Sequence, residues 1–251
     1  MSNLSYVLGK VGFATIPNKT LKDAIDAIQE KLRRQYPVIG AMTTIEYNQI
    51  EFSGAGSPQT VTISHPVLVM TDADRVFGFR LTPDSLFVHT TSYVTYKDYI
   101  TKFTEIIDSI TSVIELTHVN FIGMRYINKY QWDNQAGFSN FVKRGEFLQP
   151  ELLGLLRAGG NMTSAFLSEN KRLVVNSGVT IDSVKYPHDV FELVRDFMIE
   201  NEVKSGPWAH LDFDSFEPFE KMIPYNINTI INCFSLLHDN IKRAYLDITV
   251  N

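Results

Sequence analysis

The clearest hydrophobic pattern in the chain lies in residues 86–130 and predicts a strand, a long helix and a second strand. In residues 95–116, apolar side chains recur at intervals of three and four, which is the spacing of one helical face. Thr95 and Asp98 have the spacing of a capping box, so they mark the start of this helix. The strand at residues 118–130 is apolar on both of its faces, which predicts a buried, central position in a sheet.

Two further helices are predicted by the same periodicity, near residues 20–36 and 225–246. A strand at residues 5–15 precedes the first of them. Thr20 and Asp23 have capping-box spacing and predict that the first helix begins there.

The remaining segments are dominated by short apolar runs. In residues 43–91 these runs are separated by Gly, Pro and Asp turns, which predicts an antiparallel meander because parallel strands need long connections. Further along, residues 145–156 predict a helix, and Glu169 with Asn170 predicts a hairpin turn. The pattern at residues 188–200 is compatible with either a helix or a strand. A last strand is predicted at residues 208–213.

These elements together predict an α+β fold in which antiparallel meander sheets pack against long amphipathic helices. The chain divides into an N-terminal half, residues 1–132, and a C-terminal half, residues 133–251, packed as one globular unit. A Ser-aromatic-x-x-aromatic pattern begins at Ser92 and again at Ser215. It is compatible with a duplication, in which case a functional site is expected between the halves, and equally with two unrelated halves.

Composition and charge narrow the class of protein. The 251 residues are 44% hydrophobic and 20% charged, and the formal net charge is −5. This is typical of a globular domain and disfavours nucleic-acid binding, since no overall positive field attracts a phosphate backbone. The single cysteine, Cys233, cannot form an internal disulfide. No apolar run is long enough to cross a membrane, and the N-terminus lacks a signal-peptide pattern, so a cytoplasmic location is expected.

The strand at residues 118–130 carries two candidate ligand-binding residues, Arg125 and Asn128. Side chains alternate along a strand, so these two face opposite sides of the sheet. A buried arginine must be paired. Asp212 and Asp214 are the expected partners if Arg125 is structural, and Asn128 then caps the end of the strand. The alternative is that Arg125 binds an anionic ligand with its fork of donors.

Asp212, Asp214 and His238 complete the set of candidate site residues. The Asp-x-Asp spacing places two carboxylates on one face of a strand, as in hard-cation sites and acid pairs. The same residues are equally typical of a strand end followed by a helix start. The histidines lack metal-ligand spacing, and no nucleophile or dinucleotide motif is present. We therefore predict no metal and no cofactor, and expect His238 to be a partly buried, hydrogen-bonded residue.

Several short segments resemble a known family. They are Tyr36-Pro37, Ser92-Tyr93, residues 123–128 (Gly-Met-Arg-Tyr-Ile-Asn), residues 211–214 (Leu-Asp-Phe-Asp) and Leu237-His238. The chain is similar to a sporadically distributed family of uncharacterised bacterial proteins of about this length, with a central Arg-Tyr-Ile-Asn strand. This resemblance implies a bacterial cytoplasmic protein with an α+β fold and carries over no catalytic residues.

The leading functional hypothesis is a non-enzymatic module that binds a protein partner or associates with itself. It rests on the lack of catalytic motifs and on abundant aromatic residues, which suit interfaces. One alternative is an enzyme or small-ligand sensor with a cleft between the halves. Another is a partner protein in a toxin-antitoxin or phage-defence operon. The charge-free run at residues 60–70 predicts an open strand edge and hence a homodimer.

Overall fold

A single antiparallel sheet organises the protein. The computed structural model describes residues 3–51, 59–131, 140–148, 152, 154–155, 159–183, 186–197 and 206–250. Nine strands are hydrogen-bonded side by side in one sheet. In spatial order they are β2 (Val38–Ile39), β5 (Leu68–Thr71), β6 (Phe77–Leu81), β7 (Ser85–Thr90), β1 (Leu4–Phe13), β8 (His118–Gln131), β11 (Gly206–Pro224), β10 (Lys171–Ser183) and β9 (Gly159–Ser168). Every neighbouring pair is antiparallel.

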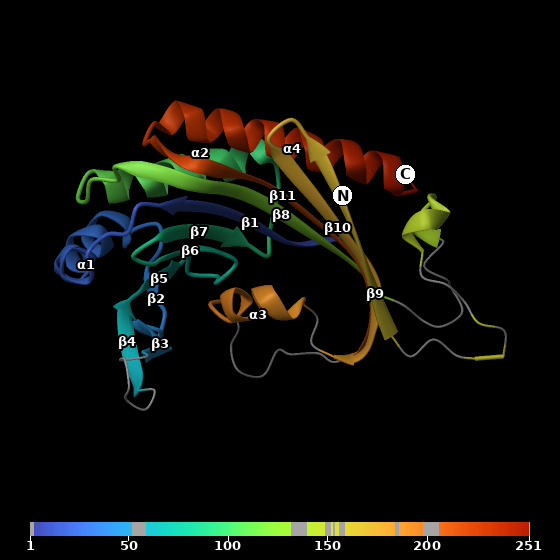
Figure 1. Ribbon diagram of the computed structural model, residues 1–251, viewed down its shortest axis with the longest axis horizontal. Helices are drawn as coiled ribbons and strands as arrows, with labels where there is room; N and C mark the ends of the chain where they lie inside the picture. The colour runs from blue at the N-terminus through green and yellow to red at the C-terminus, as the bar shows by residue number, and fades with distance from the viewer. Residues whose placement is uncertain are drawn as a thin grey trace.

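Helices cover the two faces of this sheet unequally. One face carries α1 (Asn18–Leu32), α2 (Tyr96–Thr111) and α4 (Ile227–Ile248), while α3 (His188–Val194) lies against the other (Figure 1). The predicted α+β class is confirmed, and helices occur at the three predicted places. Within the described part of the chain, no helix combines the length and the apolar content needed to span a bilayer.

The apolar faces of α2 and α4 pack against the sheet and form one core with it. Phe103 of α2 and Phe234 of α4 are fully buried, and their rings meet edge to face at 4.8 Å between centroids. The face under α3 has a second, smaller core. Its buried members are Tyr6, Leu8, Ile127, Tyr186, Val190, Leu193, Val194 and Phe197. The sheet therefore separates two cores.

The two predicted helix caps have different outcomes. Thr95 caps α2 as predicted, because its hydroxyl accepts a hydrogen bond from the Asp98 N–H at 3.1 Å. The cap predicted at Thr20 is wrong: α1 begins at Asn18, and the residue at its N-cap position is Pro17, which has no side-chain cap. Proline already holds the backbone angle φ near the value that a helix entry needs.

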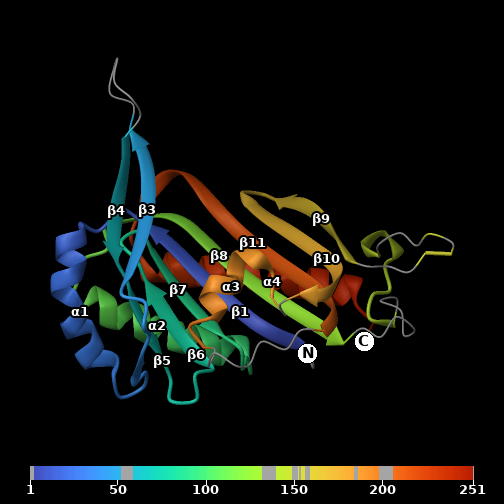
Figure 2. The same cartoon turned by 90° about the horizontal axis from the view of Figure 1, so that it is seen from below.

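The meander is shorter than predicted. Strands β5, β6 and β7 form it, but β3 (Thr44–Glu51) and β4 (Gln59–Pro66) pair only with each other in a separate two-stranded sheet, within the part of the chain that the structure describes. This hairpin projects from the body of the protein (Figure 2). The predicted open edge at residues 60–70 holds only in part: in the described part of the chain β4 pairs with β3 alone, whereas β5 lies inside the main sheet between β2 and β6.

The remaining differences between the predicted and the observed elements lie in the C-terminal half. The last strand, β11, is far longer than the predicted residues 208–213, because the acidic residues and prolines that follow are accommodated within the sheet. The ambiguous segment at residues 188–200 forms α3 over its first part. In residues 145–156, the described structure is a 3-10 turn, η2 (Gly145–Phe147), and most of the rest lies outside the described residues. The hairpin turn at Glu169 and Asn170 is confirmed.

The order of the strands repeats on either side of the central β1–β8 pair. Strands β7, β6 and β5 follow outward from β1, and β11, β10 and β9 follow outward from β8. Along the chain, α2 comes after β7 and α4 after β11. Ser92 lies in the turn between β7 and α2, whereas Ser215 lies inside β11. The two copies of the sequence pattern therefore do not occupy matching places.

Candidate functional site

Arg125 projects from the centre of β8 onto the face that carries α3. Its Nε and Nη2 donate to the two carboxylate oxygens of Asp212 on the adjacent β11, at 2.8 and 2.6 Å. This is the predicted pairing of Arg125 with one of the two aspartates. The guanidinium also donates to Asp189 at the start of α3. One arginine thus joins the central sheet to the helix that covers it.

The aspartates around Arg125 stabilise its charged form. Burial alone would lower the pKa of Arg125, but the hydrogen bonds and charges of Asp212 and Asp189 outweigh it and raise that pKa above its usual value. Asp212 is only 1% exposed, and its other contact is a long hydrogen bond of 3.5 Å from Asn176. The fork of donors on Arg125 is therefore engaged within the protein in this structure.

Asp214 lies directly across from Arg125 in the β8–β11 register, two residues beyond Asp212. Burial raises the pKa of this carboxyl to about 6, although the charge of Arg125 acts in the opposite direction. Three aspartates thus surround one arginine. Among the described residues, however, no group of three or more His, Cys, Asp and Glu side chains is arranged to hold a metal ion.

This raised pKa has a consequence for stability. The folded protein holds the Asp214 proton more tightly than the unfolded chain does, so the contribution of Asp214 becomes unfavourable as the pH rises from about 4 through about 6. We expect Asp214→Asn to increase the free energy of unfolding at pH 7 by about 1–2 kcal/mol and to change it little at pH 4. Urea unfolding at both pH values measures this. A loss of stability at pH 7 would mean that the charged carboxylate has a favourable partner.

A second arginine holds the other end of the α3 segment. Arg80 of β6 donates to both carboxylate oxygens of Asp196, at 3.0 and 2.7 Å, and to the Glu192 carbonyl oxygen at 2.8 Å. His89 lies beside this pair, and burial lowers its pKa to about 3, so it is neutral. The sequence analysis missed Arg80, Asp189 and Asp196. The available signal was the seven-residue spacing of the two aspartates in a segment of helical periodicity, although Asp196 lies just beyond the end of α3.

Asn128 and His238 lie on the opposite face of the sheet, away from Arg125. Asn128 is inside β8 rather than at its end, so the predicted strand cap is wrong; its side-chain amide donates to the Leu211 carbonyl oxygen at 3.4 Å. His238 Nδ1 lies 2.9 Å from the Tyr126 hydroxyl, which donates to the Tyr93 hydroxyl. The five candidate residues therefore divide between the two faces and do not form one site.

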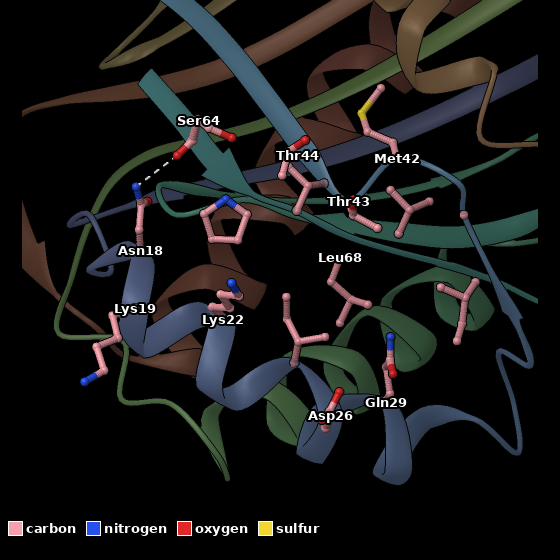
Figure 3. Close-up of a pocket in the computed structure, with 16 residues that line it drawn as sticks. Asn18, Lys19, Lys22, Asp26, Gln29, Met42, Thr43, Thr44, Ser64 and Leu68 are labelled. Carbon is pink, nitrogen blue, oxygen red and sulfur yellow. Dashed lines mark hydrogen bonds between the residues drawn. The ribbon is translucent and has the colours of Figure 1, made fainter. Parts of the chain in front are cut away.

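A cleft of about 680 Å³ lies elsewhere, between α1 and the strands at the β2 end of the sheet (Figure 3). This volume is in the range of natural ligand pockets. None of the five predicted site residues lines it. Its apolar lining comes from Ile25, Ile39, Met42, Pro66, Val67, Leu68 and Val69, and its polar lining includes Asn18, Lys19, Lys22, Asp26, Gln29, Thr43, Thr44 and Ser64.

Polar groups from both walls converge on this cleft. Asp26 and Gln29 point from α1 towards the strands, Lys22 lies on the side of α1 that faces them, and Lys19 points away (Figure 3). Asn18 joins the walls at one end, because its amide nitrogen donates to the Ser64 carbonyl oxygen at 3.3 Å. The charged lining residues are two lysines and one aspartate. Lys22 and Asp26 face the cleft, and Lys19 adds a positive charge at its rim on a protein with net charge −5.

No protein-family model matches the sequence of this chain, and no curated protein matches it either.

Proposed function

We propose that this protein is a non-enzymatic protein-binding module. Its binding site is the cleft between α1 and the strands at the β2 end of the sheet, called the α1 cleft below. The occupant is a short extended segment of a partner chain, with apolar side chains next to at least one acidic group. The observation that carries the proposal is the cleft itself, which combines an apolar floor with a few polar groups that converge from two walls. That combination is typical of recognition sites.

The shape of the cleft supports a peptide occupant. One wall is a helix, and the other is built from the end strand of the sheet, β2, and the segment that leads into β3. In the described part of the chain, β2 pairs with β5 alone. One side of this two-residue strand is therefore available for a few main-chain hydrogen bonds, and the side chains of the cleft must supply the rest of the recognition. Addition of an extended segment to a strand edge is a recurrent mode of peptide recognition.

The charge of the cleft supports an acidic occupant. Lys22 faces the cleft, and Lys19 adds positive charge at its rim, against the single negative charge of Asp26. Electrostatic complementarity of this kind steers association and contributes to specificity. The two buried arginines are a weaker basis for recognition, since Arg80 and Arg125 are already paired with carboxylates.

The proposal is tested by selecting peptides from a displayed random library on the wild-type protein and measuring their affinity by fluorescence anisotropy. We expect enriched peptides to pair apolar residues with Asp or Glu. Lys22→Glu should weaken their binding about five- to tenfold, because it replaces an attractive surface charge with a repulsive one. Ile39→Glu should also weaken it, by placing a charge where the apolar side chain now lines the cleft.

Lys31→Glu is the matched control. Lys31 is exposed on the same helix and does not line the cleft, so this variant should bind the selected peptides within about twofold of the wild type. Peptides that bind wild-type protein and Lys22→Glu equally would place the binding site elsewhere. If the library yields no enriched peptide, the peptide-binding proposal is wrong.

We also infer that the chain consists of two related units. The strand order supports β8 as the start of the second unit, so the units run from β1 to α2 and from β8 to α4, rather than over residues 1–132 and 133–251. The repeated strand order around β1 and β8 supports this relationship. So does the position of α2 and α4 on the same face of the sheet, each after the strand next to the central pair. The buried positions of the two helices correspond as Tyr99 with Ile230, Phe103 with Phe234, Ile106 with Leu237, and Ile110 with Ile241.

A further inference from the structure

Strand β9 forms one end of the nine-stranded sheet and is unusually unprotected. Among the strands that the structure describes, it pairs with β10 alone. Exposed edges are normally blunted by charged side chains, proline or short length. The sequence of β9, GGNMTSAFLS, is ten residues long and contains neither a charged residue nor proline. The opposite end of the sheet, β2, has only two residues.

The backbone groups available on this edge follow from the hairpin geometry. The β9–β10 loop has two residues, Glu169 and Asn170, and it is flanked by the pair Ser168 and Lys171. In such hairpins the flanking pair exchanges both backbone hydrogen bonds, and hydrogen-bonded pairs then alternate along the ladder. It follows that residues 159, 161, 163, 165 and 167 direct their N–H and C=O groups away from β10.

Side-chain size along β9 makes this edge complementary to itself. Gly159 and Gly160 begin the strand, and Phe166 and Leu167 lie near its end. Phe166 is 45% exposed and Leu167 is 78% exposed. If two copies pair in antiparallel fashion about Thr163, Leu167 of each copy lies opposite Gly159 of the other. Each large side chain then meets the smallest possible neighbour, and the outward backbone groups of both strands are satisfied.

We propose that two copies of this protein associate through β9, about a twofold axis at Thr163, so that their sheets join into one continuous sheet. The surface that self-associates is thus the β9 edge and not residues 60–70, where the sequence pattern had placed it. A closed twofold interface uses the same edge on both copies. The proposal is independent of the α1 cleft, which lies at the other end of the sheet.

The first test compares Ala165→Pro with Ala165→Val by light scattering at tens of micromolar. Proline removes the outward N–H of residue 165 and leaves the ladder with β10 intact, whereas valine keeps that N–H and favours strands. We expect the wild-type protein and Ala165→Val to have twice the mass of one chain, 28.6 kDa, and Ala165→Pro to have the mass of one chain with an unchanged circular dichroism spectrum. A wild-type monomer, or a dimer that survives Ala165→Pro, overturns the proposal.

Cysteine cross-linking tests the register directly. Two Thr163→Cys chains face each other at the proposed axis, so a mild oxidant should link them into a covalent dimer. Leu167→Cys is the matched control, because the two introduced thiols would lie about 27 Å apart along the paired strands. Cys233, the native thiol, is buried and present in both variants. Equal cross-linking of the two variants, or cross-linking of Leu167→Cys alone, contradicts a twofold axis at Thr163.

Discussion

Replacement of Arg125 by methionine is expected to lower the free energy of unfolding by about 3–5 kcal/mol. The reason is the carboxylate that the arginine leaves behind. Asp212 is fully buried and receives two of its hydrogen bonds from Arg125. Among the described residues, the hydrogen bond that remains to Asp212 without the guanidinium is the long one from Asn176. A buried charge without a partner is among the most destabilising features in a protein interior.

Arg144→Met is the matched control for this measurement. Arg144 also contacts two carboxylates, those of Glu146 and Asp247, but its side chain is 42% exposed and theirs are more so. Solvent screens such pairs, so we expect a much smaller change than for Arg125→Met. In urea unfolding, Arg125→Met combined with Asp212→Leu should recover part of the loss. If Arg125→Met unfolds like the wild type, Arg125 does not have a structural role.

Replacement of Phe234 by alanine should cost about 3–5 kcal/mol, the range for a large aromatic side chain removed from a packed core. Phe234 is fully buried, meets Phe103 of α2, and lies close to Gly9 in β1. Phe234 therefore lies against α2 and β1, the two elements that meet α4 at the centre of the helix-covered face of the sheet. Its removal leaves a cavity that the rigid sheet below cannot fill by relaxation.

Leu236→Ala provides the comparison on the same helix. Leu236 is 51% exposed, two residues from Phe234, and its truncation should change the free energy of unfolding by no more than about 0.5 kcal/mol. Thermal or urea unfolding of the two variants separates the loss of packing from any change in helix propensity. Equal effects of the two substitutions would contradict the packing of α4 on α2 and the sheet.

Local signals were sufficient for features that one element displays in its own residues. The position of α2 followed from one apolar stripe and from Thr95, and the central place of β8 followed from apolar residues on both of its faces. The pairing of Arg125 with Asp212 could also be predicted, because a buried charge requires a partner and few acids follow a predicted strand.

Other features that depend on distant parts of the chain could not be predicted. The length of β11 was underestimated because Asp214 and Pro218 are typical of a strand end, although both lie within the ladder with β8. Asp189 bonds to Arg125 across the sequence, and no local pattern links a short helix to a particular arginine. The α1 cleft arises because β3 and β4 leave the main sheet, which their alternating pattern does not reveal.

The central place of β1 has a consequence for how the protein acquires its structure. β1 occupies residues Leu4–Phe13, yet one of its two neighbours in the sheet, β8, ends at Gln131. Contacts so distant in sequence slow folding, because the loop must close before the strands can pair. At ordinary rates of translation, β8 is synthesised on the order of ten seconds after β1. During that time the nascent chain presents β1 first without a partner and then, once β7 is made, with one edge unpaired. Exposed apolar strands with unpaired edges are prone to aggregation, which is why such chains depend on chaperones.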